Sequence, residues 1–243
     1  MLTPMLRYPF KNIANFRDLG GLPAEENGMT RWGVFYRSAD LSRATPEEMD
    51  FILNEMNIRT IIDLRAPIEI EKWPDPFMTD KRFHWLHHSV IGDIGLDDDM
   101  GITFGEPDTR TMYNFYKFLL ERCPHEIKSL MNSLAESVKK GAVLFHCSAG
   151  KDRTGITAMF LLSLCGVTDY DIVSQYEISR TLLAHARPED NSGSHYSNME
   201  NLLAYLRDNH KTPTDYLLTA GVGEDTLKTL KLSLYEPLPK TVD

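Results

Sequence analysis

The sequence predicts an α/β fold in which a mostly parallel central sheet is flanked by helices. Short apolar or β-branched runs alternate with longer amphipathic segments, a pattern typical of parallel strands joined by crossover helices. The clearest case is the apolar run 142–145, followed by a polar loop at 146–155 and an apolar segment at 156–162. A strand, a tight loop and a helix in this order predict a site at the carboxyl end of a central strand.

The first 90 residues predict three strands and one well-marked helix. Thr45 is expected to cap this helix, with Pro46 in its first position and Glu48 completing a capping box. Apolar residues then recur on one helical face up to residue 56. The strands are expected at residues 33–38, 60–64 and 83–90, and residues 15–21 predict a turn or short strand.

Helices dominate the rest of the chain. Two are expected before the central strand and four after the central helix, at residues 112–119, 127–138, 168–184, 199–206, 215–220 and 225–235. The length fits one domain over residues 1–243, with 185–235 as a helical elaboration. Two polar stretches, residues 91–111 and 185–197, are candidate lids.

Composition narrows the classes of partner. The formal net charge of −9 argues against a broad surface for nucleic acid or anionic membrane. Residues 1–12 lack the apolar core of a signal peptide and no later segment resembles a transmembrane span, so we expect a cytoplasmic protein. The three scattered cysteines, Cys123, Cys147 and Cys165, predict reduced thiols without a disulfide framework or a metal-binding pair.

The loop at 146–155 carries the candidate chemistry. A glycine-containing loop that leads into a helix directs backbone N–H groups and the positive end of the helix dipole at one point, which predicts a phosphate site. Cys147 at its start is expected to be a thiolate nucleophile, and Arg153 offers a planar fork for two phosphate oxygens. The residues expected to line the substrate are Ser148, Ala149, Gly150, Lys151 and Thr154.

Other residues of the loop have supporting roles. His146 is expected to orient the loop through a hydrogen bond and not to act as a base, since a preformed thiolate needs none. The hydroxyl of Thr154 or Ser148 is expected to stabilise the thiolate as it leaves. Taken alone, a cysteine at a strand end is usually a packing residue, which is what we expect of Cys123 and Cys165.

Residues 146–155, HCSAGKDRTG, resemble the signature loop of the cysteine-dependent protein-tyrosine phosphatase superfamily. The GKDRTG ending is most similar to that of the atypical bacterial tyrosine and phosphoinositide phosphatases. Further matches are NFRDLGG at 15–21, YRS at 36–38, and IDLR at 62–65 with Glu69 downstream. A C-terminal similarity over 216–232 makes the resemblance nearly full-length.

The resemblance implies a protein-tyrosine-phosphatase-like fold with extra C-terminal helices. It also implies hydrolysis of a phosphate monoester through a phosphocysteine, with inorganic phosphate as product and no metal or cofactor. The substrate is left open between phosphotyrosine proteins, phosphoserine or phosphothreonine proteins, and phosphoinositides. The oligomeric state is left open as well.

Three aspartates compete for the role of general acid, which must protonate the leaving oxygen. Asp152 lies in the loop beside Arg153, where relatives with this residue order are thought to place the acid. Asp93 follows the strand at 83–90, at the position used by dual-specificity phosphatases. Asp75 belongs to a Trp-Pro-Asp triplet, but far upstream of the position that triplet has in the large tyrosine phosphatases. We favour Asp152 and then Asp93, whose alternative role is a solvated acidic loop.

Several alternatives remain at this stage. Lys151 is expected either to contact a second anionic group or to be a solvated surface lysine. Arg17, Asp18 and Arg37 are expected either to flank and support the site or to form an ion pair that holds the N-terminal segment, and we favour the ion pair. A metal site could be suggested by four histidines, His84, His87, His88 and His146. They cannot all converge as ligands, because a strand turns His84 and His88 to one face and His87 to the other. A sulfurtransferase or arsenate reductase fits the motifs less well. A non-catalytic phosphate-binding module is the main alternative to an enzyme.

Overall fold

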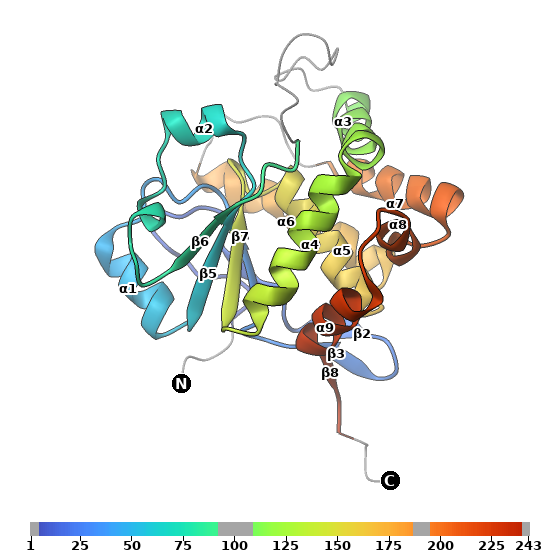
Figure 1. Ribbon diagram of the computed structural model, residues 1–243, viewed down its shortest axis with the longest axis horizontal. Coiled ribbons are helices and arrows are strands. Elements are labelled where there is room, and N and C mark those ends of the chain that lie inside the picture. Colours follow the sequence, from blue (N-terminus) through green and yellow to red (C-terminus); the bar gives the residue numbers. More distant parts are fainter. Residues whose placement is uncertain (1–4, 92–108, 187–194, 240–243) are drawn as a thin grey trace.

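The computed structural model describes residues 5–91, 109–186 and 195–239, and its centre is a five-stranded sheet (Figure 1). The strand order is β1-β4-β7-β5-β6, with β1 antiparallel to β4 and the other pairs parallel. These strands are β1 (Arg17–Asp18), β4 (Phe35–Ser38), β5 (Ile58–Asp63), β6 (His84–His87) and β7 (Ala142–His146). The predicted α/β class with a mostly parallel sheet flanked by helices is therefore confirmed.

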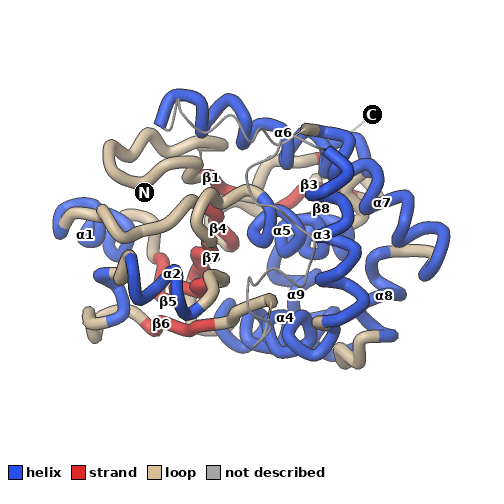
Figure 2. Tube along the Cα trace, turned by 90° about the horizontal axis from the view of Figure 1, so that it is seen from above, coloured by secondary structure: helices blue, strands red, loops and turns tan. Residues whose placement is uncertain are grey.

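Helices cover both faces of this sheet (Figure 2). Alternate side chains of β7 divide between the two sides: Val143 and Phe145 pack with α4 (Pro124–Val138) and α5 (Asp152–Leu164), whereas Leu144 packs toward α1 (Pro46–Asn54). Alternation of this kind follows from the two-residue period of a strand. Outside the first layer lie α3 (Thr109–Arg122), α6 (Asp169–Ala186), α7 (Tyr196–His210), α8 (Pro213–Thr219) and α9 (Glu224–Leu234).

The expected capping box of α1 is confirmed. The Thr45 hydroxyl accepts from the backbone N–H of Glu48, and the Glu48 carboxylate accepts from the backbone N–H of Thr45. The strand expected at 83–90 is shorter, since only His84–His87 pair with β5. Within the described part of the chain, no helix combines the length and hydropathy needed to cross a bilayer.

Three features were not predicted. The short helix α2 (Pro67–Lys72) follows β5, and the 3₁₀ helix η1 (Pro76–Met78) follows α2. A second, antiparallel sheet joins β2 (Pro23–Ala24), β3 (Gly28–Thr30) and β8 (Tyr235–Pro237). Its strands have two or three residues each, which is too short for a clear periodicity.

The register of the central sheet positions the site. Ser38 of β4 and Asp63 of β5 both lie opposite His146 of β7, so three parallel strands end at the same level. The residues that follow these ends therefore meet at one edge of the sheet, and Cys147 is the first residue after the central strand. The predicted position of the site at the carboxyl end of a central strand agrees with this arrangement.

Candidate active site

The loop between β7 and α5 has a buried cysteine at one end and a helix start at the other. Cys147 is 2% exposed, and α5 begins at Asp152. The positive end of the α5 dipole therefore lies at the loop and favours an anion there. Cys123 and Cys165 are also buried free thiols, and burial raises the pKa of Cys123 to about 11 and that of Cys165 to about 12.

Arg153 is held by a carboxylate from a different part of the sheet. Its Nη1 and Nη2 donate to Glu69 Oε2 and Oε1 at 2.5 and 3.0 Å, a two-pronged ion pair. The Ser148 hydroxyl donates to the same carboxylate, and so does the backbone N–H of Ala66, at 2.7 Å. Burial alone would raise the pKa of Glu69, but the hydrogen bonds and charge of Arg153 lower it to about 2. Glu69 is therefore a carboxylate that fixes the orientation of Arg153.

The sequence identifies Glu69 only as part of a motif and does not predict its contact with the loop. It occupies the third position of α2, where it accepts from the backbone at the helix start, and Pro67 occupies the first. A proline followed by a glutamate two residues later, directly after a strand, is a signal for a helix start that was present in the sequence.

Asp152 lies at the end of a chain of buried hydroxyl groups. The Tyr116 hydroxyl donates to Asp152 Oδ1 and lies 2.7 Å from the Tyr176 hydroxyl. Burial, followed by the charge of Asp152, raises the pKa of both tyrosines, so they remain protonated. Lys151 Nζ is 3.7 Å from Asp152 Oδ2. Lys151 is only 4% exposed, so the interpretation of this residue as a solvated surface lysine is wrong.

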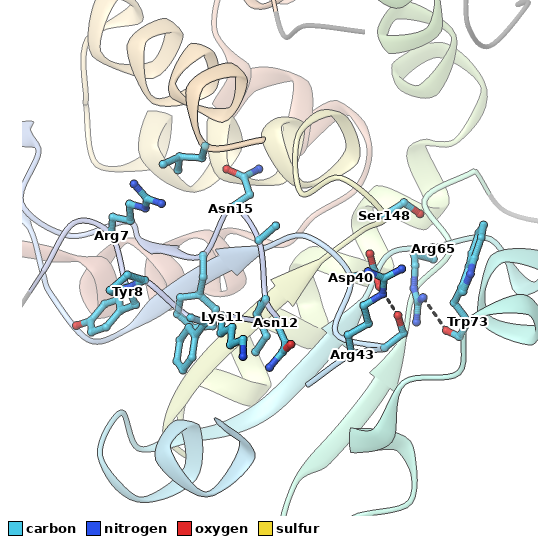
Figure 3. A pocket seen from close by; sticks show the side chains of 17 residues that line it. Arg7, Tyr8, Lys11, Asn12, Asn15, Asp40, Arg43, Arg65, Trp73 and Ser148 are labelled. Carbon is cyan, nitrogen blue, oxygen red and sulfur yellow. Dashed lines mark hydrogen bonds between the residues drawn. The ribbon is translucent and has the colours of Figure 1, made fainter. Parts of the chain in front are cut away.

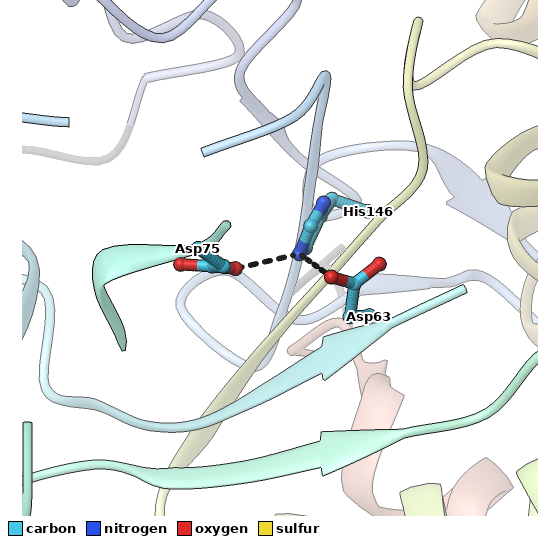
Figure 4. Close-up of side chains that lie close together, drawn as sticks. All are labelled: Asp63, Asp75 and His146. Carbon is cyan, nitrogen blue, oxygen red and sulfur yellow. Dashed lines mark ion pairs between the residues drawn. The ribbon is translucent and has the colours of Figure 1, made fainter. Parts of the chain in front are cut away.

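His146, the residue before Cys147, lies between two aspartates (Figure 4). Its Nε2 is 3.2 Å from Asp75 Oδ2 and 3.7 Å from Asp63 Oδ2, and all three side chains are buried. Burial would lower the pKa of His146, but the charge of Asp63 and the close approach of Asp75 raise it. Arg65 makes a two-pronged contact with Asp63 and, together with His146, lowers the pKa of that carboxyl against the effect of burial.

The same three side chains form the one group within the described residues that has the composition and spacing of a metal site. The imidazole of His146 already lies between the two carboxylates, and Arg65 pairs with Asp63, which weakens the case for a cation there. Asp75, the aspartate of the Trp-Pro-Asp triplet, is 2% exposed, and its Oδ1 accepts from the backbone N–H of Phe77 at the start of η1. The structure thus gives Asp75 a buried, supporting position.

Two residues of the N-terminal half hold the back of the loop through its carbonyl groups. Asn15 Nδ2 donates to the carbonyls of Ala149 and Gly150 at 2.9 and 3.0 Å. Arg37 Nη2 donates to the Gly150 carbonyl at 2.8 Å. Gly150 has φ +65°, and a Cβ there would lie 2.2 Å from the Ser38 carbonyl oxygen, so the loop requires glycine at this position.

Arg17 in turn holds Asn15. Its Nη1 donates to the Asn15 carbonyl at 3.1 Å and to the Asn15 side chain. Its other two nitrogens donate to α6. Nε donates to Gln175 Oε1 at 3.0 Å, and Nη2 donates to the Gln175 carbonyl at 2.9 Å and to Ser179 Oγ at 2.8 Å. This arginine is completely buried, and its hydrogen bonds tie β1, the loop support and α6 together.

The ion pair favoured for Arg17, Asp18 and Arg37 is therefore wrong for the contacts that the structure describes, whereas Arg17 and Arg37 have the alternative, supporting role behind the loop. Asp18 accepts instead from the backbone N–H groups of Gly20 and Gly33, at 2.8 Å each. Burial raises the pKa of Asp18 to about 6, and these hydrogen bonds oppose the shift. Hydrogen bonds to backbone groups, which sequence patterns do not reveal, hold this segment.

The remaining predicted residues divide into two groups. Thr154 is completely buried, and its hydroxyl has no hydrogen-bond partner among the described atoms, whereas the Ser148 hydroxyl is used by Glu69. Asp93 and most of the two candidate lids, residues 92–108 and 187–194, lie outside the described residues. The candidate acid that the structure describes beside Arg153 is Asp152.

Comparisons with known proteins place the whole chain, and not single site residues, among its relatives. The sequence profile of the tyrosine phosphatase family matches residues 8–236. A tyrosine-protein phosphatase of Nostoc commune is 33% identical over 222 residues, which cover 83% of this chain and 74% of that protein. A putative tyrosine-protein phosphatase of Cupriavidus necator is 31% identical over 172 residues, which cover 69% of this chain and 60% of that protein.

Solved structures of Pseudomonas aeruginosa TpbA were also found. One covers 80% of this chain and 91% of that chain, with 16% identity and a TM-score of 0.42. A TpbA variant in complex with phosphotyrosine covers 89% of this chain and 100% of that chain, with 13% identity and the same TM-score of 0.42. The family profile and the two relatives, and not these distant structures, establish the kinship: the chain belongs to the tyrosine phosphatase family.

Proposed function

We propose that this protein hydrolyses phosphotyrosine through a phosphocysteine formed on Cys147. The observation that carries the proposal is the position of Cys147 at the carboxyl end of β7, in a loop whose Arg153 is already oriented by Glu69. A nucleophile and a planar cationic fork in one short loop suit the attack on a phosphate monoester. The family membership and the names of the relatives support the same substrate.

In the first step, the Cys147 sulfur forms a bond to phosphorus while the bond from phosphorus to the tyrosine oxygen breaks. Arg153 stabilises the charge on the equatorial phosphoryl oxygens. Asp152 gives a proton to the leaving oxygen, which departs as tyrosine. The hydroxyl of Tyr116 hydrogen-bonds to Asp152 Oδ1 and holds this side chain in place.

In the second step, a water oxygen attacks phosphorus and its proton passes to Asp152. The bond from sulfur to phosphorus breaks, the sulfur keeps the electron pair, and inorganic phosphate is released. Thr154, whose buried hydroxyl is unpartnered among the described atoms, is suited to donate a hydrogen bond to the departing thiolate. We further propose that residues 1–243 act as one phosphatase domain in the cytoplasm, a reducing compartment that keeps such a cysteine active.

The test is hydrolysis of an aryl phosphate and of phosphotyrosine by the wild type, by Cys147→Ser and by the matched control Cys123→Ser. We expect Cys147→Ser to lose at least about 1,000-fold in kcat, since a serine hydroxyl is a poor nucleophile at neutral pH, while it still binds phosphotyrosine. Rapid acid quenching with radiolabelled substrate should leave phosphate on Cys147 of the wild type. Equal turnover by Cys147→Ser and the wild type would rule out the phosphocysteine mechanism, whereas a wild type that binds phosphotyrosine without hydrolysing it would favour a non-catalytic phosphate-binding module.

A substrate panel tests the finer specificity. Phosphotyrosine, phosphoserine and phosphothreonine peptides and phosphoinositide vesicles all present a monoester that the loop could accept. We expect phosphotyrosine to have the highest kcat/KM. A higher value for phosphoinositide vesicles would replace phosphotyrosine as the proposed substrate but leave the phosphocysteine mechanism intact.

A further inference from the structure

A pocket of about 650 Å³ lies beside the loop and is lined mainly by the N-terminal segment (Figure 3). Residues 7–16 form one continuous part of its wall, and Ser148, the residue after the nucleophile, belongs to its lining. In the view of Figure 3, Ser148 and Arg65 lie on one side of the pocket and Arg7 on the opposite side. The pocket therefore borders the loop at Ser148, the residue next to the candidate nucleophile.

The charges around this pocket are unlike those of the whole chain. Its lining includes four cationic side chains and one anionic side chain, whereas the chain has a formal net charge of −9. The cations are Arg7, Lys11, Arg43 and Arg65, and the anion is Asp40. Arg65 is buried and bound to Asp63, so it contributes little free charge. Arg7, Lys11 and Arg43 are exposed and form no ion pair with another described residue. A concave surface with a concentrated positive charge favours an anionic ligand.

The wall of the pocket is held in place before any ligand binds. The backbone N–H groups of Lys11 and Asn12 donate to Glu48 at 3.1 and 3.0 Å, and Asn15 is bound to the catalytic loop. Under the segment, Phe16 makes edge-to-face contacts with Tyr8 and Phe10, with ring centroids 5.9 and 4.7 Å apart. The basic side chains thus project from a fixed main chain, so binding does not require the segment to fold.

We infer that this pocket binds acidic side chains that flank the phosphotyrosine of a peptide substrate. The inference rests on the proposed function, since it requires the phosphotyrosine to be seated in the loop at the edge of the pocket. Three separate cations along a groove suit carboxylates on successive residues of an extended peptide. The aromatic side chains in the wall provide apolar surface for the rest of the peptide.

The experiment compares two phosphotyrosine peptides that differ only in their flanks, one with glutamate on both sides of the phosphotyrosine and one with glutamine. For the wild type at low salt, we expect kcat/KM to be about 5- to 10-fold higher for the acidic peptide, as exposed ion pairs contribute modestly. The difference should lie in KM, with kcat unchanged, and should shrink as salt screens the charges.

The variant Lys11→Gln/Arg43→Gln should bring the ratio of the two kcat/KM values close to one. Both substitutions keep the backbone hydrogen bonds of the segment, so the pocket wall remains in place. The control Arg122→Gln/Lys228→Gln removes the same total charge from α3 and α9 and should keep the wild-type ratio. A ratio that falls equally in the control would show a general charge effect and overturn the inference.

The outcomes also separate this inference from the proposed function. If neither peptide is hydrolysed, the proposed function fails. If both are hydrolysed at the same rate by the wild type, the function stands and the acidic subsite is refuted. If inositol lipid headgroups with a second phosphate are preferred to the acidic peptide, and Lys11→Gln/Arg43→Gln abolishes that preference, the pocket serves a lipid and the peptide proposal is overturned.

Discussion

The Arg153 guanidinium and the Glu69 carboxylate face each other as two forks, joined at 2.5 and 3.0 Å, with side chains only 14% and 15% exposed. The guanidinium plane is thereby set before a substrate arrives. An arginine that has to find its orientation after binding would lose part of its stabilisation of the transition state. Glu69 is therefore a positioning residue for the arginine of the loop.

Replacing Glu69 with glutamine should lower kcat about 10- to 100-fold, because one prong of the ion pair and its charge are lost. KM should change less, since the loop can still bind phosphate. The matched control is Glu71→Gln, an exposed residue of the same helix, which should behave like the wild type. Steady-state kinetics with an aryl phosphate provides the measurement, and a Glu69→Gln enzyme with full kcat would contradict the positioning role.

Glu69 should also make the folded protein sensitive to acid. Its pKa is about 2 in the folded state, below its ordinary value of 4.5, so its stabilising contribution is fully present above pH 4.5. That contribution, up to about 3 kcal/mol, is lost as the pH falls from 4.5 towards 2. Urea unfolding at several acidic pH values should show a shallower loss of stability in Glu69→Gln than in the wild type. If the free energy of unfolding fell equally steeply with pH in the two proteins, Glu69 would not be the source of the acid sensitivity.

Substitution of Asp152 by asparagine should have an effect that depends on the leaving group. An aryl phosphate with a good leaving group needs little protonation, so we expect a loss of about 10-fold or less. A substrate with a poor leaving group should lose about 100- to 1,000-fold in kcat. Asp208→Asn, an exposed aspartate of α7, is the control. The same comparison for Asp93→Asn tests the second candidate, and equal losses on both substrates would remove Asp152 from the role of acid.

Breaking the contact between Asp75 and His146 should destabilise the fold by about 3 to 5 kcal/mol, since Asp75→Asn leaves a buried cationic group less compensated. The pKa of His146 is raised in the folded state, so its stabilising contribution is present below the unfolded pKa of 6.5 and declines as the pH rises above it. Unfolding free energies at pH 6 to 9 should therefore decrease with pH in the wild type and decrease less in Asp75→Asn. A larger pH dependence in the variant would argue against a protonated His146.

A chelator should leave the aryl phosphatase activity unchanged. The candidate ligands Asp63 and Asp75 each already contact His146, and Asp63 also binds Arg65. The measurement is the initial rate after incubation with EDTA and gel filtration, compared with buffer alone. A loss of activity that one divalent metal restores would show that this group binds a functional ion.

The strand, loop and helix around Cys147 could be predicted from the sequence because each is specified by neighbouring residues. The apolar run 142–145, the glycine-containing loop and the apolar helix follow one another, and Arg153 is only six positions from the cysteine. The capping box of α1 was predictable for the same reason, since Thr45 and Glu48 are three residues apart. Local periodicity and helix capping act over a few residues, so they are visible without the fold.

What surrounds the loop was decided only by the tertiary structure. Glu69 is 84 residues from Arg153 and Asn15 is 135 residues from Gly150, yet the sheet order places β7 between β4 and β5 and brings their ends together. The burial of Lys151, the position of Asp75 beside His146 and the basic pocket depend on the same assembly. The sequence alone determined the reactive residues, and the folding of distant segments around one sheet edge determined how they are held.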